Sequence, residues 1–184
     1  AFMDEILENA QKNNLKIIED ASQSLGSKLK NTHTGTFSNL GCFSMYAAKV
    51  MTAGEAGMIT TTNKALYEAM QSINEFGKRI PGGSRLIQDR PDGAVNGKIS
   101  EMTALLGVLE CDRVTTRIKR RAHLVDLYAH LLHPSHFRVV KQDKGVCSYY
   151  KCIVVVLDEG KRDALREYAK EHGMLYEEVS VLNN

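Results

Sequence analysis

Apolar residues recur along this chain at two different spacings, and the alternation of the two predicts helices and strands in turn. A spacing of three and four residues, typical of amphipathic helices, runs through residues 2–10, 66–76, 100–133 and 163–172. Short apolar runs, typical of buried strands, occupy residues 15–18, 41–45, 57–62 and 152–157. Because a helix leads into the first of these strands, the pattern predicts half of a parallel α/β unit.

Polar segments between these runs predict turns and helix ends. Residues 27–36 are expected to form a turn or hairpin, and residues 78–98, rich in Gly, Arg, Asp and Pro, a long loop. Ser100 is placed to cap the long helix that follows this loop. Gly173 is placed to end the last predicted helix.

The pattern changes near residue 133, which predicts two parts. Residues 1–133 are expected to be part of an α/β domain with a long connecting helix, and residues 134–184 part of a small α+β domain. Three short strands make a poor parallel sheet, because both faces of such a sheet must be covered. We therefore expect the chain to be part of a longer protein, or to complete itself with a partner chain.

Composition excludes several classes of function. The formal net charge of +2 is too small to indicate nucleic acid or an anionic membrane as a partner. No apolar run approaches the roughly 20 residues that span a bilayer. Four cysteines without zinc-like spacing or a disulfide framework favour reduced thiols, and thus a cytoplasmic protein. Three histidines, His130, His133 and His136, are separated by Pro134 and favour a helix end over a metal site.

Candidate chemistry gathers around Lys49. Asp20 ends the first predicted strand, Gln23 follows it, and Ser44 precedes the lysine by five residues. A site for pyridoxal 5′-phosphate (PLP) needs a lysine to hold the aldehyde as a Schiff base and a carboxylate to keep the pyridine nitrogen protonated. Ligands of open α/β sheets bind at the carboxyl ends of strands, where Asp20 is expected.

Ordinary structural roles also fit these residues one by one. An aspartate after a strand can cap a turn, and a lysine in a loop can simply be solvated. Three arginines of the long loop have two equally good interpretations. They can contact a diphosphate or only solvate the loop: Arg79, Arg85 and Arg90. On the residues alone, both interpretations stand.

Longer motifs add a resemblance. The segments EDASQSLGSKL, GTFSNLGCFSMYAAKV and MTAGEAGMITT resemble, in order, the central block of the DegT/StrS family of PLP-dependent, fold-type I nucleotide-sugar aminotransferases. DGAVNGKISEMTALLGVLECDRV is similar to that family's loop and following helix, and YYKCIVVVLDEGKRDALREYAKEHGM to the start of its small C-terminal domain. Ala48 and Ala56 depart from the family's usual Thr or Ser and Gly.

The resemblance implies a role for each candidate residue. The residue that matches Lys49 carries the Schiff base, and the one that matches Asp20 contacts the pyridine nitrogen. Those that match Gln23 and Ser44 contact the ring oxygen and the phosphate. Asn96 matches an asparagine that reaches the phosphate in the neighbouring subunit's site, which implies a homodimer. A dehydratase branch of the family has histidine at the lysine position, so Lys49 favours amino transfer.

The expected fold is therefore an incomplete fold-type I aminotransferase sheet followed by the start of a small α+β domain. The expected reaction is transfer of an amino group from an amino-acid donor, typically L-glutamate, to a keto sugar on a nucleoside diphosphate. The resemblance places such enzymes in polysaccharide biosynthesis. A different class of function stays open: a truncated, non-catalytic module that keeps the dimer-forming helices and binds no cofactor.

Overall fold

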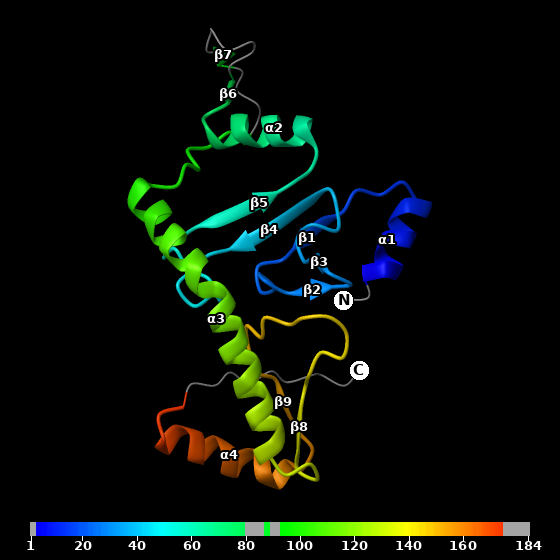
Figure 1. The fold of residues 1–184 in the computed structure, drawn as a ribbon, viewed down its shortest axis with the longest axis vertical. Coiled ribbons are helices and arrows are strands. Elements are labelled where there is room, and N and C mark those ends of the chain that lie inside the picture. Colours follow the sequence, from blue (N-terminus) through cyan, green and yellow to red (C-terminus); the bar gives the residue numbers. More distant parts are fainter. Residues whose placement is uncertain (1–2, 80–86, 89–92, 175–184) are drawn as a thin grey trace. The chain divides into compact units, whose positions relative to one another are not determined.

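The computed structural model describes residues 3–79, 87–88 and 93–174. Its elements follow the predicted order of helices and strands (Figure 1). They are α1 (Met3–Lys12), β1 (Ile18–Asp20), β2 (Lys28–Leu29), β3 (Thr32–His33), β4 (Leu40–Ser44), β5 (Gly57–Thr60), α2 (Lys64–Asn74), β6 (Lys78–Arg79), β7 (Ile87–Gln88), α3 (Glu101–Leu131), β8 (Phe137–Val139), β9 (Val154–Val156) and α4 (Glu159–Glu171). The mixture of helices and strands confirms the predicted partial α/β fold.

The chain forms two compact units. The first contains residues 1–122 and 142–150, and the second contains residues 123–141 and 151–184. Buried apolar side chains of the first unit gather around the connection from β4 to β5, and those of the second are Val125 and Ala169. The domain boundary that the sequence predicts near residue 133 stays a prediction.

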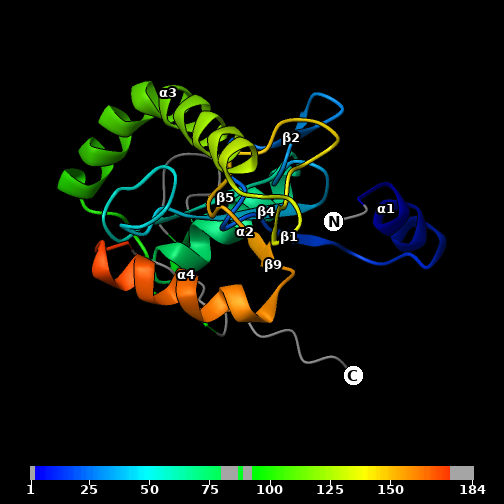
Figure 2. The ribbon, with the colours of Figure 1, turned by 90° about the horizontal axis from the view of Figure 1, so that it is seen from below.

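A three-stranded sheet is the centre of the first unit, with β4 between β1 and β5 (Figures 1 and 2). The pairing of β1 with β4 is parallel, and it aligns Asp20 with Cys42. The pairing of β4 with β5 is antiparallel, which the sequence pattern did not predict. Gly41 allows the turn at Gly35 to approach β4 closely, because a Cβ at position 41 would collide with the carbonyl of Gly35.

The first strand corrects one expectation. A buried strand over residues 15–18 was predicted, but β1 begins only at Ile18. Leu15 is 62% exposed and Ile18 is 65% exposed, so the prediction of burial was wrong. The physical reason is that β1 is an edge strand with β4 as its one partner, and the described residues leave these side chains uncovered.

Side-chain caps explain where the helices begin. Asn63 accepts a hydrogen bond from the Leu66 N–H at 3.1 Å before α2. Ser100 accepts one from the Thr103 N–H at 3.2 Å, as predicted for α3. Asp158 accepts one from the Gly160 N–H at 3.0 Å, and this cap starts α4 before the predicted Asp163.

Helix ends and faces were predicted with mixed success. Gly173 follows α4 with a φ of +64°, the left-handed conformation expected after a helix. Phe76 was predicted inside α2 but lies beyond its end, with a φ of +59°. Tyr168 was expected to face inward, but it is 55% exposed and stacks on His172 with a ring distance of 3.9 Å.

Candidate cofactor site

Lys49 lies in the connection between β4 and β5, as predicted. Its backbone N–H donates to the carbonyl of Tyr46 at 2.9 Å, which closes a turn. The next residues, Val50 and Met51, are 3% and 7% exposed and anchor the connection in the core. The Lys49 side chain is half-buried. A short, well-anchored connection therefore fixes the backbone from which the amine extends.

Asp20 lies at the carboxyl end of β1, and its side chain is exposed. The hydroxyl of Ser22 lowers the pKa of the Asp20 carboxyl most, and the Ser22 N–H, 3.0 Å from Oδ1, lowers it further. The positive charge of Lys49 also lowers this pKa. The structure thus brings the Lys49 amine within electrostatic reach of the Asp20 carboxylate.

The other candidate residues occupy three different places. Gln23 is exposed in the turn that follows β1. Ser44 ends β4 and is half-buried, and its Oγ accepts a hydrogen bond from the Tyr46 N–H at 3.3 Å. Because β1 and β4 are parallel, Asp20 and Ser44 lie at the same edge of the sheet.

Asn96 lies on a separate segment, where it pairs with Glu75 just beyond α2. Its side chain is exposed. The contact that the resemblance implies, to a neighbouring subunit's site, stays a prediction. Of the three loop arginines, Arg85 and Arg90 lie outside the described residues, as does the side chain of Arg79.

Sequence reasoning missed Tyr150. The Lys49 Nζ lies 4.6 Å from the centre of the Tyr150 ring. The two residues are far apart along the chain, and Tyr150 belongs to a segment that the sequence pattern assigned to the small domain. Only a long-range contact joins them, so spacing along the chain carries no signal for it.

Glu19 was also missed, although it precedes Asp20 directly. Its carboxylate accepts hydrogen bonds from the backbone N–H groups of Gly35 at 2.6 Å and Phe37 at 2.7 Å. It also accepts from the N–H and the hydroxyl of Ser38, each at 3.1 Å. Glu19 therefore holds the turn that leads into β4, the strand that ends at Ser44.

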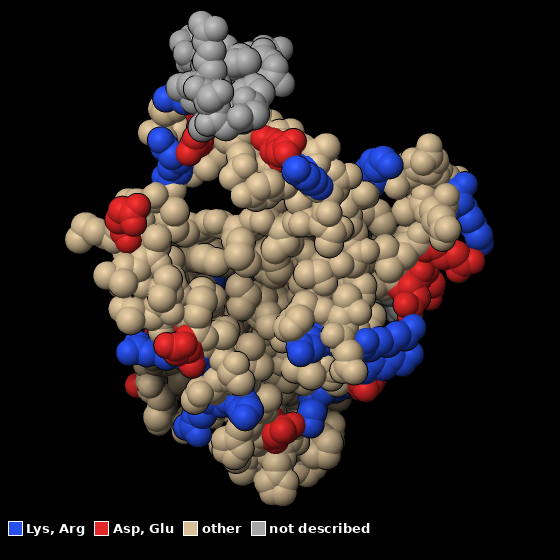
Figure 3. All heavy atoms as spheres, turned by 45° about the horizontal axis from the view of Figure 1, so that its top comes forward, with Lys and Arg blue, Asp and Glu red and all other residues tan. Residues whose placement is uncertain are grey.

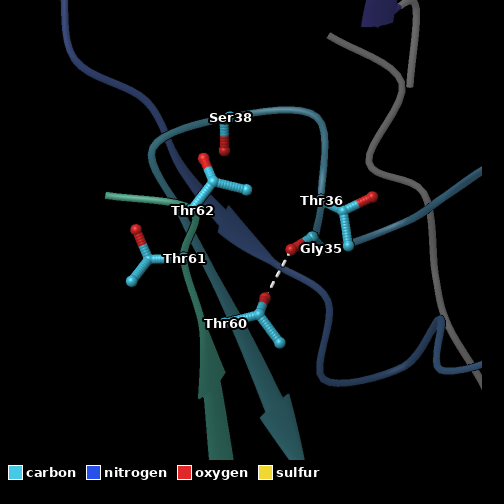
Figure 4. A pocket seen from close by; sticks show the side chains of 6 residues that line it. All are labelled: Gly35, Thr36, Ser38, Thr60, Thr61 and Thr62. Carbon is cyan, nitrogen blue, oxygen red and sulfur yellow. Dashed lines mark hydrogen bonds between the residues drawn. The ribbon is translucent and has the colours of Figure 1, made fainter. Parts of the chain in front are cut away.

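A shallow hollow lies beside this turn. Figure 4 shows its lining, which consists of Gly35, Thr36, Ser38, Thr60, Thr61 and Thr62. The Thr60 hydroxyl already donates to the Gly35 carbonyl at 2.6 Å, and the Thr61 hydroxyl to the Asn39 carbonyl at 2.7 Å. None of the five predicted site residues lines this hollow, so it is separate from the candidate site.

Elsewhere in the described residues, polar side chains pair with their neighbours. No group of three or more His, Cys, Asp or Glu side chains there could hold a metal ion. His136 instead contacts Asp158 at 3.1 Å, and His133 contacts Ser135 at 2.7 Å. No helix in the described part of the chain is long and apolar enough to cross a membrane. On the face in Figure 3, basic and acidic atoms are interspersed.

The pKa of Asp20 gives a direct test of this geometry. We expect Ser22→Ala to raise it, because the substitution removes the hydroxyl that lowers it most. The pKa should stay below its ordinary value, since the Ser22 N–H and the Lys49 charge remain. NMR titration of the Asp20 carboxyl carbon measures the change. Ser24→Ala, which removes a hydroxyl bonded to the Ala21 carbonyl, is the matched control and should leave the pKa unchanged.

The lowered pKa of Asp20 also makes the stability of the fold depend on pH. A carboxyl whose pKa is lower in the folded state stabilises the fold above its unfolded pKa. This contribution is lost as pH falls through the folded pKa of Asp20. In Ser22→Ala this contribution should therefore be smaller, and its loss should be complete at a higher pH, because the folded pKa lies closer to the unfolded one. An Asp20 pKa that is the same in Ser22→Ala and in the wild type would contradict the assigned cause.

Known proteins are similar to this chain in sequence and in fold. GDP-perosamine synthase of Escherichia coli O157:H7 is 28% identical over 167 residues, which are 90% of this chain and 44% of that enzyme. The structure of DesI in the presence of its TDP-sugar product matches with a TM-score of 0.81 and 27% identity, over 95% of this chain and 44% of that one. The PLP form of Spr1654 from Streptococcus pneumoniae shares the fold, with a TM-score of 0.79 and 21% identity over 94% of this chain and 50% of that one.

The chain thus spans about half the length of the relatives that it matches. The fold that it shares with them is that of the fold-type I aminotransferases, as the resemblance implied. A family model matches residues 1–179, which is nearly the whole chain. This chain belongs to the DegT/DnrJ/EryC1/StrS aminotransferase family.

Proposed function

We propose that the protein transfers an amino group from an amino-acid donor to a keto sugar carried on a nucleoside diphosphate, with PLP as its cofactor. The observation that carries the proposal is the placement of Asp20 at the end of β1 and of Lys49 after β4, because these two strands are parallel and their carboxyl ends lie at one edge of the sheet. The positive charge of Lys49, which helps to lower the pKa of Asp20, supports it. Family membership and relatives that act on a GDP sugar or hold a TDP sugar support the substrate class.

The residues present fit the cofactor. An exposed Asp20 whose pKa is lowered is ionised at neutral pH, which is the form that pairs with a protonated pyridine nitrogen. The Ser44 hydroxyl would bind the phosphate, and the Gln23 amide would contact the ring oxygen. PLP, when bound, draws electrons away from the Cα of the amino-acid donor.

Lys49 has two tasks in this proposal. Its amine would hold the aldehyde of the cofactor and, once displaced by the amino donor, would accept the proton that leaves the Cα of the donor. A half-buried lysine on an anchored turn suits both tasks, because the backbone that carries the amine is fixed. We further propose L-glutamate as the donor.

A homodimer is the proposed assembly, with Asn96 acting in the partner's site. The described residues leave one apolar face of α3 open, formed by Met102, Leu105, Leu106, Val108 and Leu109, which are between 51% and 82% exposed. Faces of this kind mark interaction surfaces in proteins. This face also favours the second candidate function, a dimerising module that binds no cofactor.

We expect charge on this face to weaken the dimer. Leu105→Lys should raise the dissociation constant of the dimer by at least about tenfold, because it places a charge in an apolar contact. Sedimentation equilibrium measures the constant. Leu131→Lys, at a position 69% exposed near the other end of α3, is the matched control. Equal constants for both variants and the wild type would contradict an interface at this face.

Direct assay tests the proposed reaction. The native protein is incubated with GDP-, UDP- or TDP-linked keto sugars, L-glutamate and PLP, and the aminated sugar is detected by mass spectrometry. We expect product with at least one of these sugars and none after PLP has been removed. A dimer that neither binds PLP nor forms any aminated sugar would instead establish the second candidate function.

A further inference from the structure

Tyr150 reaches the candidate site through an unusual path of the chain. The segment Gln142–Tyr150 belongs to the first unit, whereas the residues on both sides of it belong to the second. Within the first unit it pairs with β2: the N–H groups of Lys28 and Val146 each donate to the other's carbonyl, both at 2.8 Å. The segment is therefore attached to the unit that contains Lys49.

Ser148 adds further hydrogen bonds between the segment and the first unit. It is 1% exposed, and its N–H donates to the Ser27 Oγ at 3.0 Å. The hydroxyls of Ser27 and Ser148 also lie 3.0 Å apart and share a hydrogen bond. A nearly inaccessible serine with both polar groups paired leaves the backbone before Tyr150 little freedom.

Arg121 of α3 holds the end of the segment. Its Nη1 donates to the Tyr149 carbonyl at 3.2 Å and to the Tyr150 carbonyl at 3.0 Å. Tyr149 has a φ of +48°, a conformation that bulky residues rarely adopt. Such strain persists only where surrounding contacts hold it, and it gathers at functional sites.

The consequence of this backbone path is the position of the Tyr150 ring. The Lys49 Nζ lies 4.6 Å from the ring centre, within the range of about 6 Å in which a lysine ammonium is attracted to an aromatic face. From this geometry we infer that Tyr150 is a positioning residue, whose ring restrains the Lys49 amine.

We assign the effect on Lys49 to the aromatic face of Tyr150, whose centre lies 4.6 Å from the Nζ. A phenylalanine at position 150 should therefore restrain Lys49 as tyrosine does. An aliphatic residue of similar bulk should not. The effect of Tyr150 on catalysis rests on the proposed function. Its effect on the position of the Lys49 amine does not. The two can be measured apart.

Chemical labelling of lysines tests the inference without cofactor or sugar. The native protein is treated with an acylating ester, and the rate at Lys49 is divided by the rate at Lys64, whose side chain is 88% exposed in the same unit. We expect Tyr150→Leu to raise this ratio about two- to fivefold, because the amine is no longer held against the ring. Tyr150→Phe should keep the wild-type ratio.

A second variant covers the case in which Tyr150→Leu does not fold. Arg121→Met releases the two carbonyls and should also raise the ratio. The inference is overturned if folded Tyr150→Leu keeps the wild-type ratio, or if Tyr150→Phe behaves like Tyr150→Leu.

Kinetics extend the test to the reaction. In the active protein Tyr150→Leu should lower kcat by a similar factor and leave the KM of the amino donor unchanged, and Tyr150→Phe should restore kcat. An unchanged kcat in Tyr150→Leu would overturn the positioning role. Because labelling needs no catalysis, a failure of the proposed function is distinguished from a failure of this inference.

Discussion

Replacing Lys49 with methionine is expected to lower kcat for amino transfer by about a thousandfold or more. In the proposed reaction Lys49 is both the group that holds the cofactor and the base that moves the proton, and a positioned acid–base group alone contributes about 10²–10⁴-fold. The free energy of unfolding should change by less than about 1 kcal/mol, since the backbone turn and the buried Val50 remain. Product formation followed by mass spectrometry measures kcat.

Two controls make this result specific. Lys49→Arg keeps the positive charge beside Tyr150, yet it should be as inactive as Lys49→Met, because a guanidinium does not give up its proton. Lys64→Met, at a solvated position of α2, should keep wild-type kcat. Substantial turnover by Lys49→Arg would mean that the charge of the residue, and not its amine chemistry, serves the reaction.

Glu19→Ala is expected to lower the free energy of unfolding by about 3 kcal/mol. The substitution leaves three backbone N–H groups of residues 35–38 without their acceptor, and each hydrogen bond to a charged group contributes about 1.5–3 kcal/mol before relaxation of the turn. Urea denaturation measures the loss. Glu19→Gln keeps one acceptor oxygen and should lose less.

A matched control is available on α1. Glu8 is also a glutamate, but it pairs with Lys12 on the surface, where its side chain is 64% exposed. Glu8→Ala should change the free energy of unfolding by less than about 0.5 kcal/mol. Equal losses in Glu8→Ala and Glu19→Ala would contradict the role given to Glu19.

Local chemistry made most of the fold predictable. Ser100 caps α3 and Gly173 follows α4 as expected, because caps depend on residues only a few positions away. Burial was predicted less well. Ile18 has the type of side chain found in buried strands, but whether it is covered depends on the neighbours of β1, which no pattern in residues 15–18 specifies.

In the candidate site, too, local features were predictable and long-range contacts were not. The placement of Asp20 and Lys49 at one edge of the sheet was predictable, because Asp20 ends β1, Lys49 follows β4, and the parallel pairing of these strands brings their carboxyl ends together. Their roles stay predictions. Tyr150 was not predicted because its place depends on a buried serine, an arginine of α3 and a strained backbone acting together. Glu19 was not predicted because its partners are backbone groups, which leave no mark in the sequence.

The central claim is that the amine of Lys49 holds the cofactor. Treatment of the PLP-loaded native protein with borohydride fixes PLP covalently to the lysine that holds its aldehyde, and peptide mass spectrometry then identifies that residue. The account predicts a modified peptide that contains Lys49, and loss of this modification in Lys49→Met. Modification of a different lysine in the wild type, or none at all, would contradict it.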